Sequence, residues 1–293
     1  MPPIRPAPFA FPSLTRGALT PGSLALGLLA LTALGSAAPA RAQAYRDAYQ
    51  NGAIAAAAGR SDEAHGHFTR AAQGARAAGD ADVEARARRV LAQIAYNRGA
   101  RLAWAGRHDS ALARFEAGIV QNPDYVRNHI GAGLSLDALA RRDDAIAALK
   151  RGIEAGQRGD PDLAASAEAT LRGLFTSTAR TYVEAATPTR AGADVALRAL
   201  DALELYLPAD AASLYLRAAA LLVMRQPLDA SNAATRGLDL YRGSRDGAAG
   251  LHFVRGEALL ALGDRAGARA SFQQALYERF RTRAEQRLRE LAR

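Results

Sequence analysis

Apolar residues recur along this chain at intervals of three and four, which is the spacing of one face of a helix. Within this pattern, small and bulky apolar residues also recur at a longer, fixed spacing. A small residue is followed twelve positions later by alanine, and four positions after that by a third apolar residue. The copies are Gly52, Ala64 and Phe68; Gly99, Ala111 and Phe115; Gly133, Ala145 and Leu149; Ala218, Ala230 and Ala234; and Gly256, Ala268 and Phe272. Five copies of one template predict a repeated structural unit.

Each copy is interrupted by turn-forming residues between its small residue and its alanine. Gly59, Gly106 and Gly263 lie in these interruptions, and glycine commonly ends a helix where a short polar side chain can begin the next one. Pro227 suits the first turn of a helix, because its missing N–H costs nothing there. On both sides of the break the apolar residues keep helical spacing, so we expect each unit to be two antiparallel helices joined by a tight turn.

The unit resembles the tetratricopeptide repeat, a helix pair of roughly 34 residues with the pattern W-x2-L-G-x2-Y…A-x3-F…P. The best stretch here reads Arg98-Gly99-x2-Leu102, then Ala111-x3-Phe115, then Pro123. The resemblance covers residues 45–280. It implies an all-α, right-handed solenoid of antiparallel helix pairs, with the first helix of each pair lining a concave groove that takes a peptide or a partner's helix.

Within a single solenoid domain of residues 43–293 we expect six units and a C-terminal cap. The fourth unit departs from the template, because Glu184 stands where the small residue is expected. We expect a long helix over 161–186 in this unit and a return helix over 195–207. The expected units are 45–78, 92–125, 126–159, 162–208, 211–244 and 249–280.

The last segment, residues 281–293, is predicted to be a capping helix. Phe280, Ala284, Leu288 and Leu291 share one face, and arginines occupy the other. A solenoid needs such an end, with one apolar side over the last repeat and one polar side toward water.

Residues 1–42 read as a secretory signal peptide. Arg5 and Arg16 precede an apolar run over 23–35, and Ala40-Arg41-Ala42 follows as a signal-peptidase site, so cleavage is expected near Ala42. The alternative is an uncleaved membrane anchor, although the apolar run is shorter than the roughly 20 residues that span a bilayer. We therefore expect an exported protein, periplasmic or secreted, with no membrane span after cleavage.

Charge and motifs argue against nucleic-acid binding and against catalysis. The net charge falls from +9 to +6 once the three arginines of residues 1–42 are subtracted, and the remaining arginines are interspersed with acids as on solvated helix faces. No enzyme motif is present, and His65 and His67 diverge on a helix. Asp80, Asp82 and Glu84 are expected to lie at the N-terminus of a helix, where the helix dipole stabilises negative charge. The sequence thus predicts no nucleic-acid partner, no enzyme, no cofactor and no metal.

Aromatic residues are few, yet they concentrate three positions before the small residue of each repeat. In the resemblance this position faces the groove, and it holds Tyr49, Tyr96, Ile130, Tyr215 and Phe253. Aromatic side chains give a large contact area at low entropic cost; the alternative is that they pack sideways onto the adjacent helix. Polar or large neighbours expected in the same groove are Gln93, Asn97, Arg101, Trp104 and Arg127.

These features favour a non-enzymatic protein–protein interaction scaffold or adaptor in the bacterial cell envelope, holding a peptide or partner segment in its concave groove. The alternative is a regulatory or small-ligand-binding solenoid that serves a separate catalytic chain. The partner's identity and the oligomeric state do not follow from the sequence.

Overall fold

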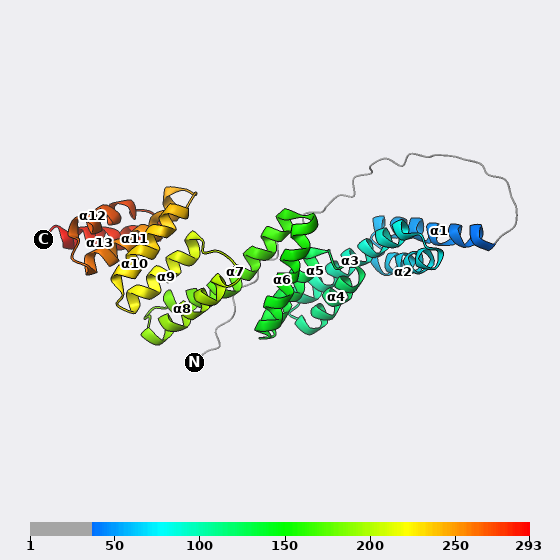
Figure 1. The fold of residues 1–293 in the computed structure, drawn as a ribbon, viewed down its shortest axis with the longest axis horizontal. Helices are drawn as coiled ribbons and strands as arrows, with labels where there is room; N and C mark the ends of the chain where they lie inside the picture. Colours follow the sequence, from blue (N-terminus) through cyan, green and yellow to red (C-terminus); the bar gives the residue numbers. More distant parts are fainter. Residues whose placement is uncertain (1–36) are drawn as a thin grey trace.

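The computed structural model describes residues 37–293, which are helical throughout with short connections and contain no strand (Figure 1). Alanine-rich segments with apolar residues at helical spacing explain this uniform preference. The elements are α1 (Ala37–Ala57), α2 (Ser61–Ala78), α3 (Ala81–Trp104), α4 (His108–Gln121), α5 (Val126–Ala138), α6 (Arg142–Gly159), α7 (Pro161–Val183), α8 (Arg190–Glu204), α9 (Ala211–Val223), α10 (Pro227–Leu240), α11 (Arg245–Ala261), α12 (Arg265–Gln274), the 3-10 turn η1 (Glu278–Phe280) and α13 (Arg281–Leu291).

The helices form consecutive antiparallel pairs that follow one another from α1 at one end to α13 at the other (Figure 1). Each helix packs against the helices before and after it. The first helices of adjacent pairs also touch one another, α3 with α5, α5 with α7, α7 with α9 and α9 with α11. The second helices make no comparable contacts with one another in residues 37–293. The first helices therefore form the inner row of an all-α solenoid.

The spacing of small and bulky residues is explained by a contact between the two helices of a pair. A Cβ atom placed on Gly99 would lie 2.7 Å from the ring of Phe115, and one on Gly256 would lie 2.6 Å from the ring of Phe272. Real Cβ atoms do not approach carbon this closely, so glycine alone admits the ring. The bulky residue of the second helix thus lies directly on the backbone of the first helix.

Helix ends follow the turn residues of the sequence. Gly106 and Gly263 adopt the left-handed conformation, with φ of 72° and 85°, in which glycine is favoured. Asp80 and Asp160 cap the following helices, each accepting a hydrogen bond of 3.1 Å from the backbone N–H three residues on. Asp80 also accepts a 2.8 Å hydrogen bond from the Tyr45 hydroxyl, which ties α1 to the start of α3.

The fourth helix pair differs from the sequence expectation at the connection between its helices. The long helix α7 ends at Val183 rather than at 186, and the return helix α8 begins at Arg190 rather than at 195, because Thr189 caps its N-terminus. The turn is longer than in the other pairs, so counting back from Ala196 reaches Glu184, which lies beyond the helix. The small residue of α7 that shares a buried cluster with Ala196 is Ala179.

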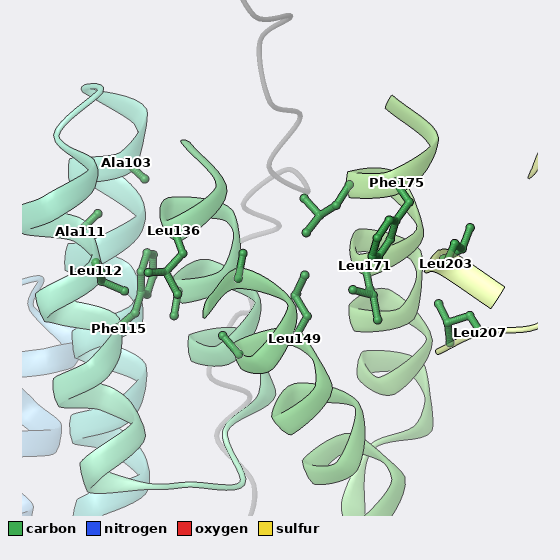
Figure 2. Packing of buried hydrophobic residues seen from close by; sticks show 14 residues of the cluster. Ala103, Ala111, Leu112, Phe115, Leu136, Leu149, Leu171, Phe175, Leu203 and Leu207 are labelled. Atoms are coloured by element: carbon green, nitrogen blue, oxygen red, sulfur yellow. The ribbon is translucent and has the colours of Figure 1, made fainter. Parts of the chain in front are cut away.

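Buried side chains form a chain of adjoining clusters along the stack. The largest runs from α3 to α8, where Phe115 on α4, Leu136 on α5, Leu149 on α6 and Leu171 on α7 succeed one another (Figure 2). At the C-terminal end Phe280, Ala284 and Leu291 are buried and Leu288 packs against them, as predicted for a cap.

The predicted signal segment lies outside the described residues except for 37–42, which form the start of α1. Cleavage near Ala42 therefore stays a prediction. None of the helices within residues 37–293 is both long enough and apolar enough to cross a bilayer.

The burial of His129 is expected to make the stability of the chain depend on pH. The side chain is 3% exposed, its Nε2 lies 2.7 Å from the Pro123 carbonyl oxygen, and its Nδ1 is buried without a partner. Burial lowers the pKa of His129, partly offset by the hydrogen bond to Pro123. The His129 imidazole therefore binds a proton more readily in the unfolded chain than in the folded one. Its contribution to stability is fully present above about pH 6.5 and is lost as the pH falls toward the lowered folded-state pKa.

We expect the melting temperature of the wild type to fall between pH 8 and pH 5, and that of His129→Gln to fall less, because the amide can still donate to Pro123 but does not titrate. Circular dichroism melts at several pH values measure both slopes. Some decline remains in the variant, since burial also lowers the pKa values of His65 and His252. Parallel slopes for the two proteins would show that His129 does not contribute.

Candidate binding surface

The ten residues that the sequence suggested for binding all lie on first helices, the inner row of the solenoid. They are distributed as Tyr49 on α1; Gln93, Tyr96, Asn97, Arg101 and Trp104 on α3; Arg127 and Ile130 on α5; Tyr215 on α9; and Phe253 on α11.

Tyr49, Tyr96 and Phe253 pack against the second helix of their own pair. The ring centroid of Tyr49 lies 5.3 Å from that of Phe68, and the rings of Tyr96 and Phe115 lie 6.0 Å apart. Phe253 is 5.6 Å from Phe272 and only 4% exposed. These side chains therefore help to hold the helix pair together, and Phe253 offers a ligand little surface. Ile130 is likewise packed against two buried clusters.

The polar neighbours are open to solvent. Gln93, Asn97, Arg101 and Arg127 are exposed, and Trp104 is 67% exposed at the end of α3. They share the α3–α5 side of the inner row with Tyr96, whose ring also lies 6.3 Å from Tyr125. This region is a polar surface over partly buried aromatic rings. Its binding role stays a prediction.

A cavity of about 550 Å³, which we name the C-terminal groove, opens farther along the inner row. It is formed by the end of α7, by α9 and α11, and by η1 and α13, so three consecutive first helices and the cap contribute to it. The residues that matter for its chemistry are Glu184, Tyr215, Phe253, Glu257, Phe280 and Arg283. Of the residues suggested by sequence, the structure brings Tyr215 and Phe253 together here.

The floor of the C-terminal groove is aromatic. The ring of Phe280 lies 6.2 Å from that of Tyr215 and 5.6 Å from that of Phe253. Tyr215 also lines a second cavity of about 320 Å³ on its other side. Burial is the main cause that raises the pKa of the Tyr215 hydroxyl, followed by the charge of Glu184. The phenol therefore keeps its proton at neutral pH and can donate a hydrogen bond.

Charged groups surround this floor. Arg279 lies 3.1 Å from the carboxylate of Glu184, and Arg287 contacts both carboxylate oxygens of Glu257, at 2.7 and 2.9 Å. The guanidinium of Arg283 lies over the ring of Phe253, 4.4 Å from its centroid, in cation–π geometry. The groove thus combines apolar rings with cations held at its edge.

Sequence reasoning missed Phe280 and Arg283 as parts of this surface. Phe280 was assigned to the apolar side of the cap and the arginines of 281–293 to its solvent side, which holds for most of them. The turn η1 packs on α11 and α13 packs on α12, and together they place Arg283 over Phe253 of α11 at an angle set by this packing. No local pattern carries that angle.

Within residues 37–293, no group of three or more histidine, aspartate or glutamate side chains is placed to hold a metal ion. The buried polar side chains are Asn128, His129, Ser135, Ser213 and Ser271, and none of them lines the C-terminal groove. The chemistry of the groove is therefore that of its aromatic rings, arginines and glutamates.

No protein-family profile and no curated protein matches the chain. Among solved structures, MamA from Desulfovibrio magneticus RS-1 is similar at 17% identity and a TM-score of 0.38, over 64% of this chain and 93% of that one. A tetratricopeptide repeat protein from Parabacteroides merdae has 14% identity and a TM-score of 0.34, over 86% and 100%. A thermophilic TPR protein from Thermus thermophilus has 20% identity and a TM-score of 0.30, over 67% of this chain and 98% of that one. By the geometry of its own helix pairs, this chain is an all-α solenoid of the tetratricopeptide-like kind.

Proposed function

We propose that this chain is a non-enzymatic protein–protein interaction scaffold or adaptor that holds a segment of a partner in the C-terminal groove. The observation that carries the proposal is the groove itself, in which three consecutive first helices and the cap enclose about 550 Å³ beside the ring of Tyr215. Aromatic rings on a rigid helical frame bind a partner's side chains with little loss of entropy. A stack of helix pairs can present such a surface without any catalytic group.

The test begins with a random peptide display library selected against the purified chain. The most enriched peptide is then synthesised with a fluorescent label, and its dissociation constant is measured by fluorescence anisotropy. Saturable binding that depends on groove residues supports the proposal. Failure to select any peptide, together with a thermal shift caused by small metabolites, would favour the small-ligand alternative instead.

Tyr215→Ala is expected to weaken binding of the selected peptide by at least about tenfold, because a buried aromatic anchor at the centre of an interface commonly contributes about 2 kcal/mol or more. Tyr206→Ala is the matched control. Tyr206 is a partly exposed tyrosine stacked on Phe175, 6.0 Å away, and it lies outside the groove. Its removal should change the dissociation constant by less than about twofold. Equal effects of the two substitutions would contradict a site at Tyr215, and circular dichroism checks that both variants stay helical.

We further propose that the protein acts in the cell envelope after export, which is supported by the charged, apolar and small-residue order of residues 1–42. Mass spectrometry of protein recovered from the envelope of a bacterial host should give an N-terminus at Gln43. A chain that keeps its first residues and stays with the membrane would favour the uncleaved anchor.

A further inference from the structure

Two glutamates and two arginines are the charged side chains that line the C-terminal groove, and three of these four are held in ion pairs. Both glutamates of the groove are already engaged, Glu184 by Arg279 at 3.1 Å and Glu257 by Arg287 through two contacts of 2.7 and 2.9 Å. Paired in this way, neither carboxylate is available to neutralise a further cation. A lining arginine that has no carboxylate partner of its own is then available to pair with an incoming acid.

Arg283 is such an arginine. Within residues 37–293 no carboxylate lies at ion-pair distance from its guanidinium, whose contact is with the face of the Phe253 ring, 4.4 Å from the centroid. Stacking on the ring holds the planar group in one orientation and leaves its N–H edge for another acceptor. The side chain is exposed and lines the groove, so an incoming group can reach it.

Tyr215 adds a neutral donor to the same groove. No side chain or backbone atom in the described part of the chain is hydrogen-bonded to its hydroxyl, and burial keeps the phenol protonated. At this phenol the negative charge of Glu184 raises the pKa, and the positive charges of Arg279, Arg283 and Arg180 oppose it. Between the two donors lie the rings of Phe253 and Phe280. A ligand that pairs with the arginine, accepts a hydrogen bond from the phenol and contacts the apolar surface must carry an anionic group directly beside an apolar side chain.

We propose that the partner segment held in the C-terminal groove is acidic, with an aspartate or glutamate carboxylate paired to Arg283 next to an apolar side chain that lies against the partly exposed ring of Tyr215. The inference rests on the proposed function, because it names the chemistry of the segment bound in that groove. Guanidinium and carboxylate match in a two-point hydrogen-bonded geometry, and the neighbouring rings exclude part of the water that would weaken the pair.

The test is the composition of the peptides that the display library yields. Aspartate and glutamate should be enriched over the input library in peptides selected by the wild type, and this enrichment should disappear with Arg283→Gln. Arg289→Gln on the same helix is the matched control, since it removes the same charge from an exposed side chain outside the groove. For the synthesised peptide, replacing its acids by the matching amides should weaken binding to the wild type by about fivefold to tenfold and binding to Arg283→Gln by less than about twofold.

The outcomes separate this inference from the proposed function. Peptides without acid enrichment that still depend on Tyr215 would overturn the acidic partner and keep the groove. Equal effects of Arg283→Gln and Arg289→Gln would show that overall charge, and not this subsite, attracts the acids. Absence of any selected peptide would overturn both proposals. Circular dichroism melts of the two glutamine variants establish that each is folded.

Discussion

Phe115→Ala is expected to lower the free energy of unfolding by about 3–5 kcal/mol, the usual cost of emptying a buried phenylalanine site. Phe115 is fully buried on α4 and belongs to the largest cluster of the core (Figure 2). Its ring lies on the backbone of α3 at Gly99 and on that of α5 at Gly131. Both neighbours are glycines and have no side chain to refill the space. Urea unfolding followed by circular dichroism measures the loss.

Val120→Ala on the same helix is the control for this substitution. Val120 is 68% exposed, so its truncation should change the free energy of unfolding by less than about 0.5 kcal/mol. Because each pair of a solenoid contacts only its neighbours, amide hydrogen exchange in Phe115→Ala should accelerate in α3 to α5 more than in α10 to α12. A loss below about 1 kcal/mol, or uniform acceleration along the chain, would contradict the role assigned to the Phe115 ring.

Gly131→Ala is expected to destabilise the chain by about 1–3 kcal/mol, although alanine is the better helix former. A Cβ atom at this position would lie 2.5 Å from the Phe115 ring. The ring has little room to move aside, because it also lies on the α3 backbone at Gly99, where an added Cβ atom would be 2.7 Å from it. The gain in helix propensity, up to about 1 kcal/mol, is therefore outweighed by the strain of overpacking.

Two comparisons isolate the cause. At Gly173 in α7 an added Cβ meets nothing within 4 Å, so Gly173→Ala should stabilise the chain by about 0.5–1 kcal/mol. In the Phe115→Ala background the obstacle is gone, and Gly131→Ala should then become stabilising as well. Denaturant unfolding of the single and double variants gives the coupling. If Gly131→Ala destabilises equally in both backgrounds, contact with Phe115 is not the reason for the glycine.

The repeat template was predictable because it reflects a contact between two residues that are close in sequence, the small residue of the first helix and the bulky residue of the second. Where the second helix carries a ring, as at Phe115 and Phe272, the first helix carries glycine. Where the second helix carries Ala234, alanine at position 218 is small enough, and both are fully buried. The same reasoning failed in the fourth pair, because it assumed a constant turn length.

The candidate site was predictable only in part. The sequence placed Tyr215 and Phe253 on the inner row, since their position within the repeat defines the helix face that they occupy. It could not tell that Phe253 is buried, because Phe280 and Arg283 cover the side of this ring that Phe272 of its own pair leaves open. These residues are separated from Tyr215 by more than one repeat, and they reach it through the packing of α13 on the stack.

The sequence by itself determined the helix pairs and their close contacts, because a glycine and a ring sixteen residues apart meet across one turn, and that distance is short enough for spacing to encode it. The tertiary structure decided where a groove opens and which charges remain unpaired along it. Those properties depend on how successive pairs and the cap are rotated against one another. Each rotation results from small packing differences at many residues, so it cannot be inferred from the spacing of any two residues in the sequence.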